Sequence, residues 1–456
     1  MNTKKNTSRR WPLVLLALII LALAVFLFIR LEGQPPTVAL ALDRPALGAQ
    51  QTLTLHVADA KSGIRSVWAA VETEGREVVV FDRTFPSAGI WAGGVVREET
   101  VSLPFAPRDK GIADGPAVLR LVVRDYSWRS WGKGNAHVVE EAVRIDTRPP
   151  AVEVLSQQHY LAQGGSGLVI YRLSEACPVS GVMVGDEFYP GYGGHFADAA
   201  IHMAFFALTH EQGPGTPIHI SATDEAGNEG RAGIPHLINA RRFKKDTIAI
   251  SDSFLDSLMP AFINEVGAAP GTSNFDIFMK VNNELRVANN EALQKVTARS
   301  DHRMHWQGAF TQLPGAANRA GFADHRTYTY KGRVIDEQYH LGVDLASLAQ
   351  APVPAANAGR VAYADFSGIY GNTVVLDHGM GLFSLYSHLS HMAVAPEQMV
   401  AKGDIIGKTG RTGLAVGDHL HFSVLIHHTF VNPLEWWDSQ WVQNNITAKI
   451  EAVGKP

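Results

Sequence analysis

Four histidines lie close together in the stretch GDHLHFSVLIHH, which runs from Gly417 to His428. In a β-strand, successive side chains point to opposite faces, so His419 and His421 would project side by side, away from an apolar row. Two imidazoles placed in this way could hold a metal ion or position a metal-bound water molecule. An isolated His-x-His pair also occurs at exposed sheet edges, so this stretch alone leaves both interpretations open.

Two stretches upstream supply groups that suit the same chemistry. YHLGVDLAS offers His340 and Asp344, and LYSHLS offers His388. Zinc prefers nitrogen and carboxylate ligands, and a catalytic zinc keeps three protein ligands and one water. Two histidines and one aspartate meet that requirement, and such a metal acidifies its water and polarises a carbonyl. Two further histidines could transfer protons and stabilise a developing oxyanion.

Two other stretches are similar to known functional motifs but do not match them fully. HEQGP at His210 lacks the second histidine of the His-Glu-x-x-His helix, so the helical zinc-protease pattern is missing from the sequence. GDIIGKTG is similar to a phosphate-binding loop, but three residues separate Gly403 from Gly407 where that loop needs four.

The remaining histidines of this region are expected to have ordinary roles. His378 in LDHG and His391 in LSHM are rival candidates for catalysis, but we interpret both as structural or surface residues. His427 and His428 are expected in a solvated turn at the end of the strand.

Taken together, these stretches resemble the lysostaphin/LytM-type family of zinc metallopeptidases, which cut peptide bonds in peptidoglycan. The similarity covers about residues 336–434 and includes PVPAANAGRVAYA, GIYGNTVVLDHGMGLFSLYSHLS, VAKGDIIGKTGRTG and a closing VNP, in the family's order. The resemblance implies one zinc ion per chain, bound by His340, Asp344 and His421. It also implies that His388 and His419 are the catalytic histidines of an endopeptidase that acts on peptidoglycan cross-links or stem peptides.

Two alternative functions remain open at this point. Some LytM-type domains have lost metal ligands and activate separate cell-wall amidases, and a zinc protease of protein substrates would carry the same residues. The presence of all five residues favours an enzyme over a silent regulator. Arg326, Tyr328 and Tyr330 lie just before the first ligand. They could line a substrate groove, assist the transition state or simply pack, so they stay outside the predicted site.

The composition and length of the chain limit its possible partners, its cross-links and its number of domains. A net charge of −4 over 456 residues gives no basic signature, so nucleic acid is not an expected partner. The single cysteine, Cys177, excludes an intramolecular disulfide and a cysteine-rich zinc site, so stability must come from packed cores. The length suggests about three domains.

The N-terminus predicts a membrane anchor. Residues 1–10, MNTKKNTSRR, are basic, and residues 11–29 form an apolar run without charge that is long enough to cross a bilayer core of about 30 Å. A cleaved signal peptide usually has a shorter apolar region and a small-x-small site, which we do not find after this run. We therefore expect a single-pass protein with a cytoplasmic N-terminus and an extracytoplasmic catalytic domain, periplasmic in a Gram-negative cell.

The rest of the chain predicts a mainly β fold. Short alternating segments predict two β-sandwich modules, residues 36–148 and 149–235, which resemble bacterial immunoglobulin-like domains. They would act as spacers, or bind cell-wall polymer or a cell-wall or divisome protein. Helical spacing predicts a connecting segment over 240–305, broken near Pro260, and a shielding role for it is open. An antiparallel β metallopeptidase domain is expected over 306–436, followed by a C-terminal tail, 437–456.

Overall fold

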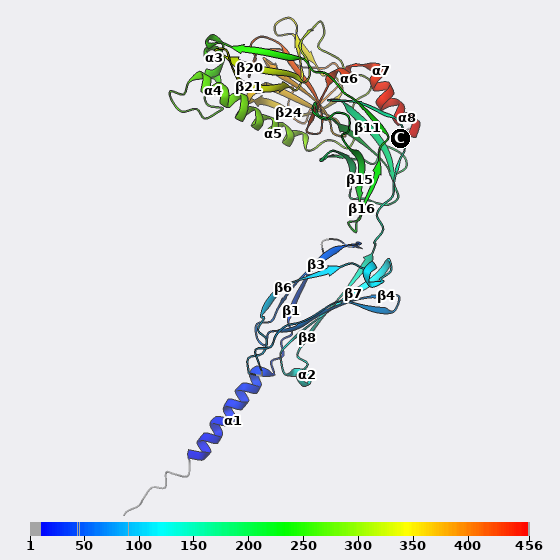
Figure 1. Ribbon diagram of the computed structural model, residues 1–456, viewed down its shortest axis with the longest axis vertical. Helices are drawn as coiled ribbons and strands as arrows, with labels where there is room; N and C mark the ends of the chain where they lie inside the picture. Colours follow the sequence, from blue (N-terminus) through cyan, green and yellow to red (C-terminus); the bar gives the residue numbers. More distant parts are fainter. Residues whose placement is uncertain (1–10, 43, 45, 90, 455–456) are drawn as a thin grey trace, which may run out of the picture. The chain divides into compact units, whose positions relative to one another are not determined.

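The computed structural model describes residues 11–454 apart from residues 43, 45 and 90. The basic segment 1–10, expected in the cytoplasm, lies outside the described residues. The prediction of a mainly β fold is confirmed (Figure 1). The chain divides into two compact units, Met1–Pro149 with Thr223–Glu229, and Pro150–Ala222 with Gly230–Pro456.

The first unit begins with a long apolar helix, α1 (Trp11–Arg30). By length and composition this helix is able to cross a membrane, which is compatible with an anchor or a signal sequence. At about 1.5 Å per residue, its 20 residues span about 30 Å.

The β part of the first unit, called module 1 below, contains two sheets. One sheet has the antiparallel order β1-β3-β6 and the other has the order β2-β8-β7-β4-β5. Alternate residues of β3, β4 and β7 are buried between the sheets, as the period of two in their sequences predicts. The elements are β1 (Thr37–Ala41), β2 (Ala46–Leu47), β3 (Gln51–Ala58), β4 (Ile64–Thr73), β5 (Arg76–Thr84), β6 (Glu98–Phe105), η1 (Arg108–Lys110), β7 (Gly115–Asp125), α2 (Arg129–Gly132) and β8 (Ala136–Ile145).

The second unit opens with another set of small sheets, called module 2 below. Its sheets have the orders β14-β11-β9 and β13-β12-β15-β16, with β10 and β17 paired in parallel. The strands are β9 (Val152–Val154), β10 (His159–Ala162), β11 (Ser166–Leu173), β12 (Val179–Val184), β13 (Glu187–Pro190), β14 (Ile201–Ala207), β15 (Ile218–Thr223), β16 (Glu229–Gly233) and β17 (His236–Asn239).

Helices occupy the region where the sequence predicted a helical segment. The Ser251 hydroxyl accepts a hydrogen bond from the amide of Phe254 and caps α3, and Ser273 caps α4 in the same way. Helix α3 gives way to a 3-10 turn that contains Pro260, because proline cannot donate to the preceding turn. The elements are β18 (Lys245–Ile250), α3 (Asp252–Leu258), η2 (Met259–Phe262), α4 (Asn274–Lys280), the π-helix η3 (Val281–Leu285) and α5 (Arg286–Thr297).

A large antiparallel sheet forms the centre of the second unit. Its order is β19-β22-β30-β26-β25-β24-β28, and β31 pairs with β30. Two smaller sheets, β18-β20-β21 and β23-β29-β27, flank it. The elements are β19 (Ala317–Ala320), β20 (Asp324–Tyr330), β21 (Arg333–His340), β22 (Val343–Ala346), β23 (Pro352–Pro354), β24 (Gly359–Ser367), η4 (Gly368–Tyr370), β25 (Gly371–Gly379), β26 (Leu382–Leu389), β27 (His391–Met392), β28 (Met399–Val400), β29 (Ile405–Lys408), β30 (Leu420–Ile426) and β31 (Thr429–Val431).

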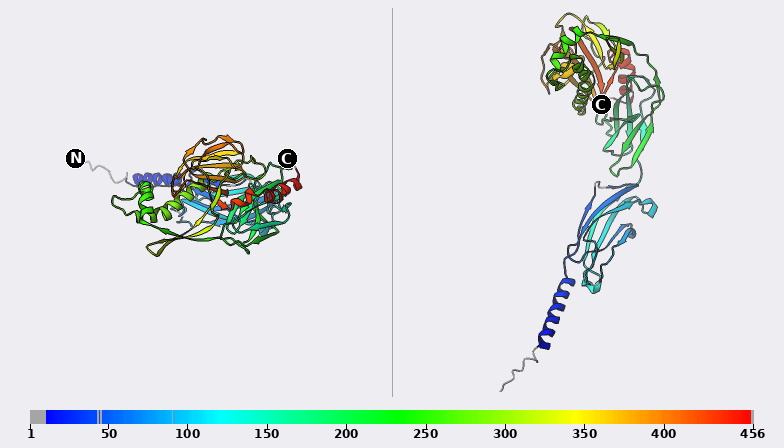
Figure 2. Two further views of the ribbon diagram at one scale, coloured as in Figure 1. Left: turned by 90° about the horizontal axis from the view of Figure 1, so that it is seen from above. Right: turned by 60° about the vertical axis from the view of Figure 1, so that its left-hand side comes forward.

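The chain ends in short helices that pack on module 2: α6 (Pro433–Trp437), α7 (Ser439–Val442), η5 (Gln443–Thr447) and α8 (Ala448–Val453). Lys449 Nζ donates to the carbonyl of Leu168 in β11 at 3.1 Å, and Trp436 is fully buried. Both views of Figure 2 show these red helices beside the strands of module 2. Module 2, the large sheet and the C-terminal helices all contribute residues to one hydrophobic core. Residues 437–454, which the sequence predicted only as part of a tail, therefore help to join module 2 to the large sheet.

Candidate metal centre and active-site groove

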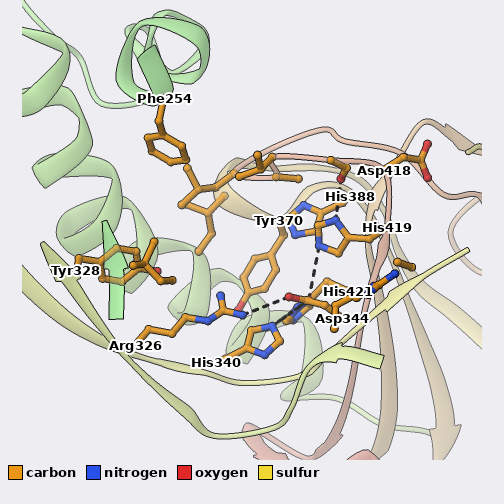
Figure 3. Close-up of a pocket in the computed structure, with 18 of the residues that line it drawn as sticks. Phe254, Arg326, Tyr328, His340, Asp344, Tyr370, His388, Asp418, His419 and His421 are labelled. Atoms are coloured by element: carbon orange, nitrogen blue, oxygen red, sulfur yellow. Dashed lines mark hydrogen bonds and ion pairs between the residues drawn. The ribbon is translucent and has the colours of Figure 1, made fainter. Parts of the chain in front are cut away.

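A groove of about 410 Å³ opens beside the large sheet (Figure 3). Its floor holds residues from β21, β22 and β30, which are neighbours in or next to that sheet. One wall comes from β18, β20 and the helices, and the other from the loop between β29 and β30. All five residues predicted to do chemistry line this groove: His340, Asp344, His388, His419 and His421.

Strand pairing brings three of these residues to one point. Asp344 of β22 lies directly across from His421 of β30 in the antiparallel register, and His340 ends β21 four residues earlier. Asp344 Oδ1 lies 2.9 Å from both His340 Nε2 and His421 Nδ1, and these two nitrogens are 3.0 Å apart. Two nitrogens and one carboxylate oxygen therefore converge on one small volume.

The outer hydrogen bonds leave the converging atoms free to bind a cation. His340 Nδ1 donates to the carbonyl of Gly321 at 2.8 Å, which leaves the Nε2 lone pair available. The Ser423 hydroxyl donates to the carbonyl of Leu341, so it accepts from His421 Nε2 and leaves the Nδ1 lone pair available. Outer partners of this kind fix the tautomer and orientation of metal ligands, and the donor set is one that zinc prefers. The residues present thus fit a zinc ion.

The protonation states agree with this interpretation. Burial raises the pKa of Asp344, but its interactions with His340 and His421 outweigh that effect, and the pKa lies well below the usual range. Burial lowers the pKa of His421 to about 4, although the hydrogen bond to Asp344 acts in the opposite direction. Near neutral pH the aspartate is therefore ionised and His421 is neutral, as metal ligands must be.

The two predicted catalytic histidines lie beside this cluster. His388 and His419 have ring centroids 4.8 Å apart, and His419 Nε2 is 3.6 Å from Asp344 Oδ1. Each ring is held by its Nδ1, which donates to the carbonyl of Thr412 for His388 and of Gly417 for His419, both at 2.8 Å. The Nε2 atom of each ring is thereby left for a substrate or a water molecule.

Three further residues of the groove were not predicted as site residues. Tyr370 is buried, its hydroxyl donates to Asn290 Oδ1, and burial raises its pKa to about 12, so it stays protonated. Arg286 and Arg319 also line the groove. No spacing in the sequence links Arg286, which lies on a helix, to strand residues more than fifty positions later.

The aromatic and basic residues before the first ligand have separate roles. Arg326 Nη2 lies 3.3 Å from Asp344 Oδ2, and Tyr328 lines the groove (Figure 3). Tyr330 stacks on Phe275 with ring centroids 4.7 Å apart and therefore packs the strand against the helices.

The rival histidines do not line the groove. His378 is buried, with Nδ1 at 2.7 Å from the carbonyl of Ala358 and Nε2 at 2.7 Å from the Ser384 hydroxyl. His391 is exposed on β27. The expectation of a solvated turn is wrong for His427, which is buried because its ring stacks on Tyr192 of module 2.

Comparisons with known proteins match this part of the chain. The model of peptidase family M23 matches residues 338–433. Over 95 residues the chain is 39% identical to the DD-carboxypeptidase/endopeptidase Mpg of Neisseria meningitidis serogroup B, which covers 21% of this chain and 22% of that protein. Over 116 residues it is 33% identical to the peptidoglycan DD-endopeptidase ShyB of Vibrio cholerae serotype O1, which covers 25% of this chain and 26% of that protein.

A solved structure with a similar domain is the catalytic domain of lysostaphin from Staphylococcus simulans. It is 26% identical, with a TM-score of 0.26, and the match covers 29% of this chain and 98% of that chain. The chain spans about a quarter or less of the length of the two curated relatives it matches.

Proposed function

Since residues 338–433 form a peptidase family M23 domain, we propose that this protein is a zinc-dependent endopeptidase that hydrolyses peptide bonds of peptidoglycan. One observation carries the proposal. His340 Nε2, Asp344 Oδ1 and His421 Nδ1 converge on the floor of a groove that also holds His388 and His419.

The residues of the groove have different roles in peptide hydrolysis: three would bind the metal ion and two would transfer protons or stabilise the oxyanion. His340, Asp344 and His421 would hold the zinc ion, which when bound acidifies water and polarises a carbonyl. Of His388 and His419, one accepts the proton of the attacking water and the other donates a hydrogen bond to the oxyanion. Hydrogen bonds from both rings to backbone carbonyls hold them in place for these steps.

The charge of the groove supports an anionic peptide as the substrate. Three arginines line it, Arg286, Arg319 and Arg326, against two aspartates, Asp344 and Asp418. Arg326 pairs with Asp344, whereas Arg286 donates to the neutral Asn282, and Arg319 is exposed without an ion-pair partner among the described residues. The peptide stems of peptidoglycan carry free carboxylates, and glycine bridges carry none. We therefore infer that the groove takes stem peptides or their direct cross-links, as the names of the curated relatives also suggest.

The location of the groove follows from α1. We infer that α1 is an uncleaved single-pass anchor with its N-terminus in the cytoplasm and the peptidase outside, in the periplasm of a Gram-negative cell. The packing of Arg30 and Glu32 into module 1 supports retention of the helix, because both side chains are buried there. Binding of a cell-wall or divisome protein by the β modules stays a prediction.

Digestion of purified peptidoglycan tests the activity. The full chain in detergent, loaded with zinc, should convert cross-linked muropeptide dimers to monomers, as identified by mass. Glycine-bridged peptidoglycan should be cut much more slowly. His421→Ala should release nothing. A wild-type protein that binds one zinc ion but cuts neither substrate would contradict the enzyme and favour the silent regulator, which activation of a cell-wall amidase would then reveal.

A further inference from the structure

The C-terminal end of α1 is built into module 1 without a free linker. The amide of Trp128 donates to the carbonyl of Arg30 at 2.7 Å, and the Ser127 hydroxyl donates to the carbonyl of Glu32 at 2.8 Å. The guanidinium of Arg30 donates to the carbonyl of Tyr126 at 3.0 Å. These bonds join the end of the helix to the loop between β7 and β8, so helix and module cannot turn freely about this point.

Two tryptophans of module 1 contact the last turns of α1. The ring of Phe26 lies 4.6 Å from that of Trp91 and 5.2 Å from that of Trp128, measured between centroids. Trp91 belongs to the loop between β5 and β6, and Trp128 to the loop between β7 and β8. Phe26 is half-buried by these contacts, whereas the rest of the apolar span before Arg30 is exposed.

These contacts set the depth of the tryptophans in a bilayer, a step that rests on the proposed anchor. Arg30 ends the apolar span and therefore lies near the headgroups. Phe26 precedes it by four residues, a rise of about 6 Å, which places its ring at the boundary between headgroups and acyl chains. Rings in contact with Phe26 lie at the same level. Tryptophan is favoured at this level because one end of its ring is apolar and the other is polar.

A third tryptophan, Trp131, lies in the same loop as Trp128, three residues further along the chain. Trp131 is 102% exposed and Trp91 is 78% exposed, which is unusual for large aromatic side chains that face only water. Trp131 also has a φ of +57°, a left-handed conformation that bulky residues avoid, so the loop keeps this exposed ring at the cost of an unfavourable backbone conformation. Arg129 and Lys133 flank it in sequence. Arg129 Nε donates to the carbonyl of Leu31 at 2.9 Å, whereas Lys133 is exposed and suits the phosphates of lipid headgroups.

We propose that Trp91, Trp128 and Trp131 form a membrane-interface clamp that seats the rim of module 1 in the outer leaflet. The partner is the lipid interface of the membrane that α1 crosses. The clamp and the bonded end of α1 together hold module 1 at a fixed orientation on the bilayer. Module 1 then stays at a fixed height above the bilayer, and the distance from the membrane to the cell wall is measured from this fixed point.

The depth of a spin label tests this clamp in the full chain. Trp131→Cys and Trp91→Cys, each in a Cys177→Ser background, carry a nitroxide after reconstitution in vesicles of phosphatidylethanolamine and phosphatidylglycerol. The matched control is Arg76→Cys, an exposed position at the start of β5, which pairs there with Thr73 at the far end of β4. Strand β4 is about 30 Å long and begins near the end of α1. All three positions are exposed, so the labels should not disturb folding.

The collision rates of the label with oxygen and with a water-soluble nickel chelate give the result. We expect the oxygen-to-chelate ratio at positions 131 and 91 to exceed the ratio at position 76 several-fold. If the three positions gave equal ratios, the clamp would be overturned. If the same protein resisted alkaline extraction, the proposal that α1 is a membrane anchor would still hold. Release of the protein by alkaline extraction would overturn both. Neither result depends on peptidase activity, so the proposed enzyme is tested separately.

Discussion

The guanidinium of Arg326 lies 3.3 Å from Oδ2 of Asp344, while Oδ1 of the same carboxylate contacts His340 and His421. The two oxygens therefore have different roles, because the arginine holds one and the other faces the ligand cluster. An aspartate held in this way can offer a metal ion one oxygen in a fixed direction. Arg326 comes from β20, a strand outside the large sheet, so the contact depends on how two sheets pack.

Removal of this arginine should weaken the metal centre. We expect Arg326→Ala to lower zinc affinity or peptidase activity by about 10- to 100-fold, the usual cost of losing an outer partner of a metal ligand. Arg326→Lys should restore part of the loss, because a lysine keeps the charge without the fork of donors. Competition with a chromogenic chelator measures the affinity. The control Arg333→Ala removes an exposed arginine of β21, and an equal effect there would contradict the assignment.

Zinc stoichiometry should separate the ligands from the catalytic histidines. Alanine at His340, Asp344 or His421 should abolish the binding of one zinc ion per chain. Alanine at His388 or His419 should leave the bound zinc in place and lower the rate of muropeptide release by about 10²- to 10⁴-fold, the usual effect of losing a proton-transfer group. Loss of zinc from both His388→Ala and His419→Ala would mean that the roles have been assigned to the wrong residues.

A methyl group at Gly342 should displace a metal ligand. A Cβ atom there would lie 2.5 Å from the Ser423 hydroxyl and 2.6 Å from His421 Nε2, closer than atoms normally approach. We expect Gly342→Ala to push the imidazole aside and weaken zinc binding by about 10-fold or more, because the outer hydrogen bond of the ligand is lost with it. Gly233→Ala is the matched control, since its Cβ would meet nothing within 4 Å. Equal zinc affinity in the two variants would contradict the role of Gly342.

Only part of the groove could be predicted from local rules. Strand alternation places His419 and His421 on one face of a strand. The family resemblance alone implied that Asp344 lies beside His421, 77 positions away, and the structure pairs the two in register. The structure also brings His340, His388 and His419 to the same groove. Membership in the site could be predicted for these residues, whereas their individual roles rest on family resemblance.

Other features depend on packing between distant parts of the chain. Arg286 reaches the groove only because the π-helix and α5 lie against its wall. His427 is buried only because module 2 places Tyr192 on it, and the C-terminal helices gain their contacts from β11 of that module. A residue pattern read along one segment carries no information about a surface supplied by another, so these features could not be predicted.

Glu435 should make the stability of the second unit depend on pH. Burial raises its pKa from 4.5 to about 7, and the hydrogen bond from the amide of Ser166, at 3.0 Å, only partly offsets that effect. A carboxyl group whose pKa is higher in the folded chain stabilises the fold fully below the unfolded pKa. That contribution is lost as pH rises through about 7, because the folded chain must then bury a charge.

The variant Glu435→Gln keeps the shape of the side chain and removes the charge. We expect its free energy of unfolding, relative to wild type, to increase between about pH 5 and pH 8 by an amount on the order of 3 kcal/mol, the equivalent of the pKa shift. Urea unfolding of the detergent-solubilised chain, followed by tryptophan fluorescence, gives both curves. Other buried groups titrate equally in the two proteins, so they cancel in the difference. If the two curves ran parallel across this range, the buried carboxyl group would not be the source of the pH dependence.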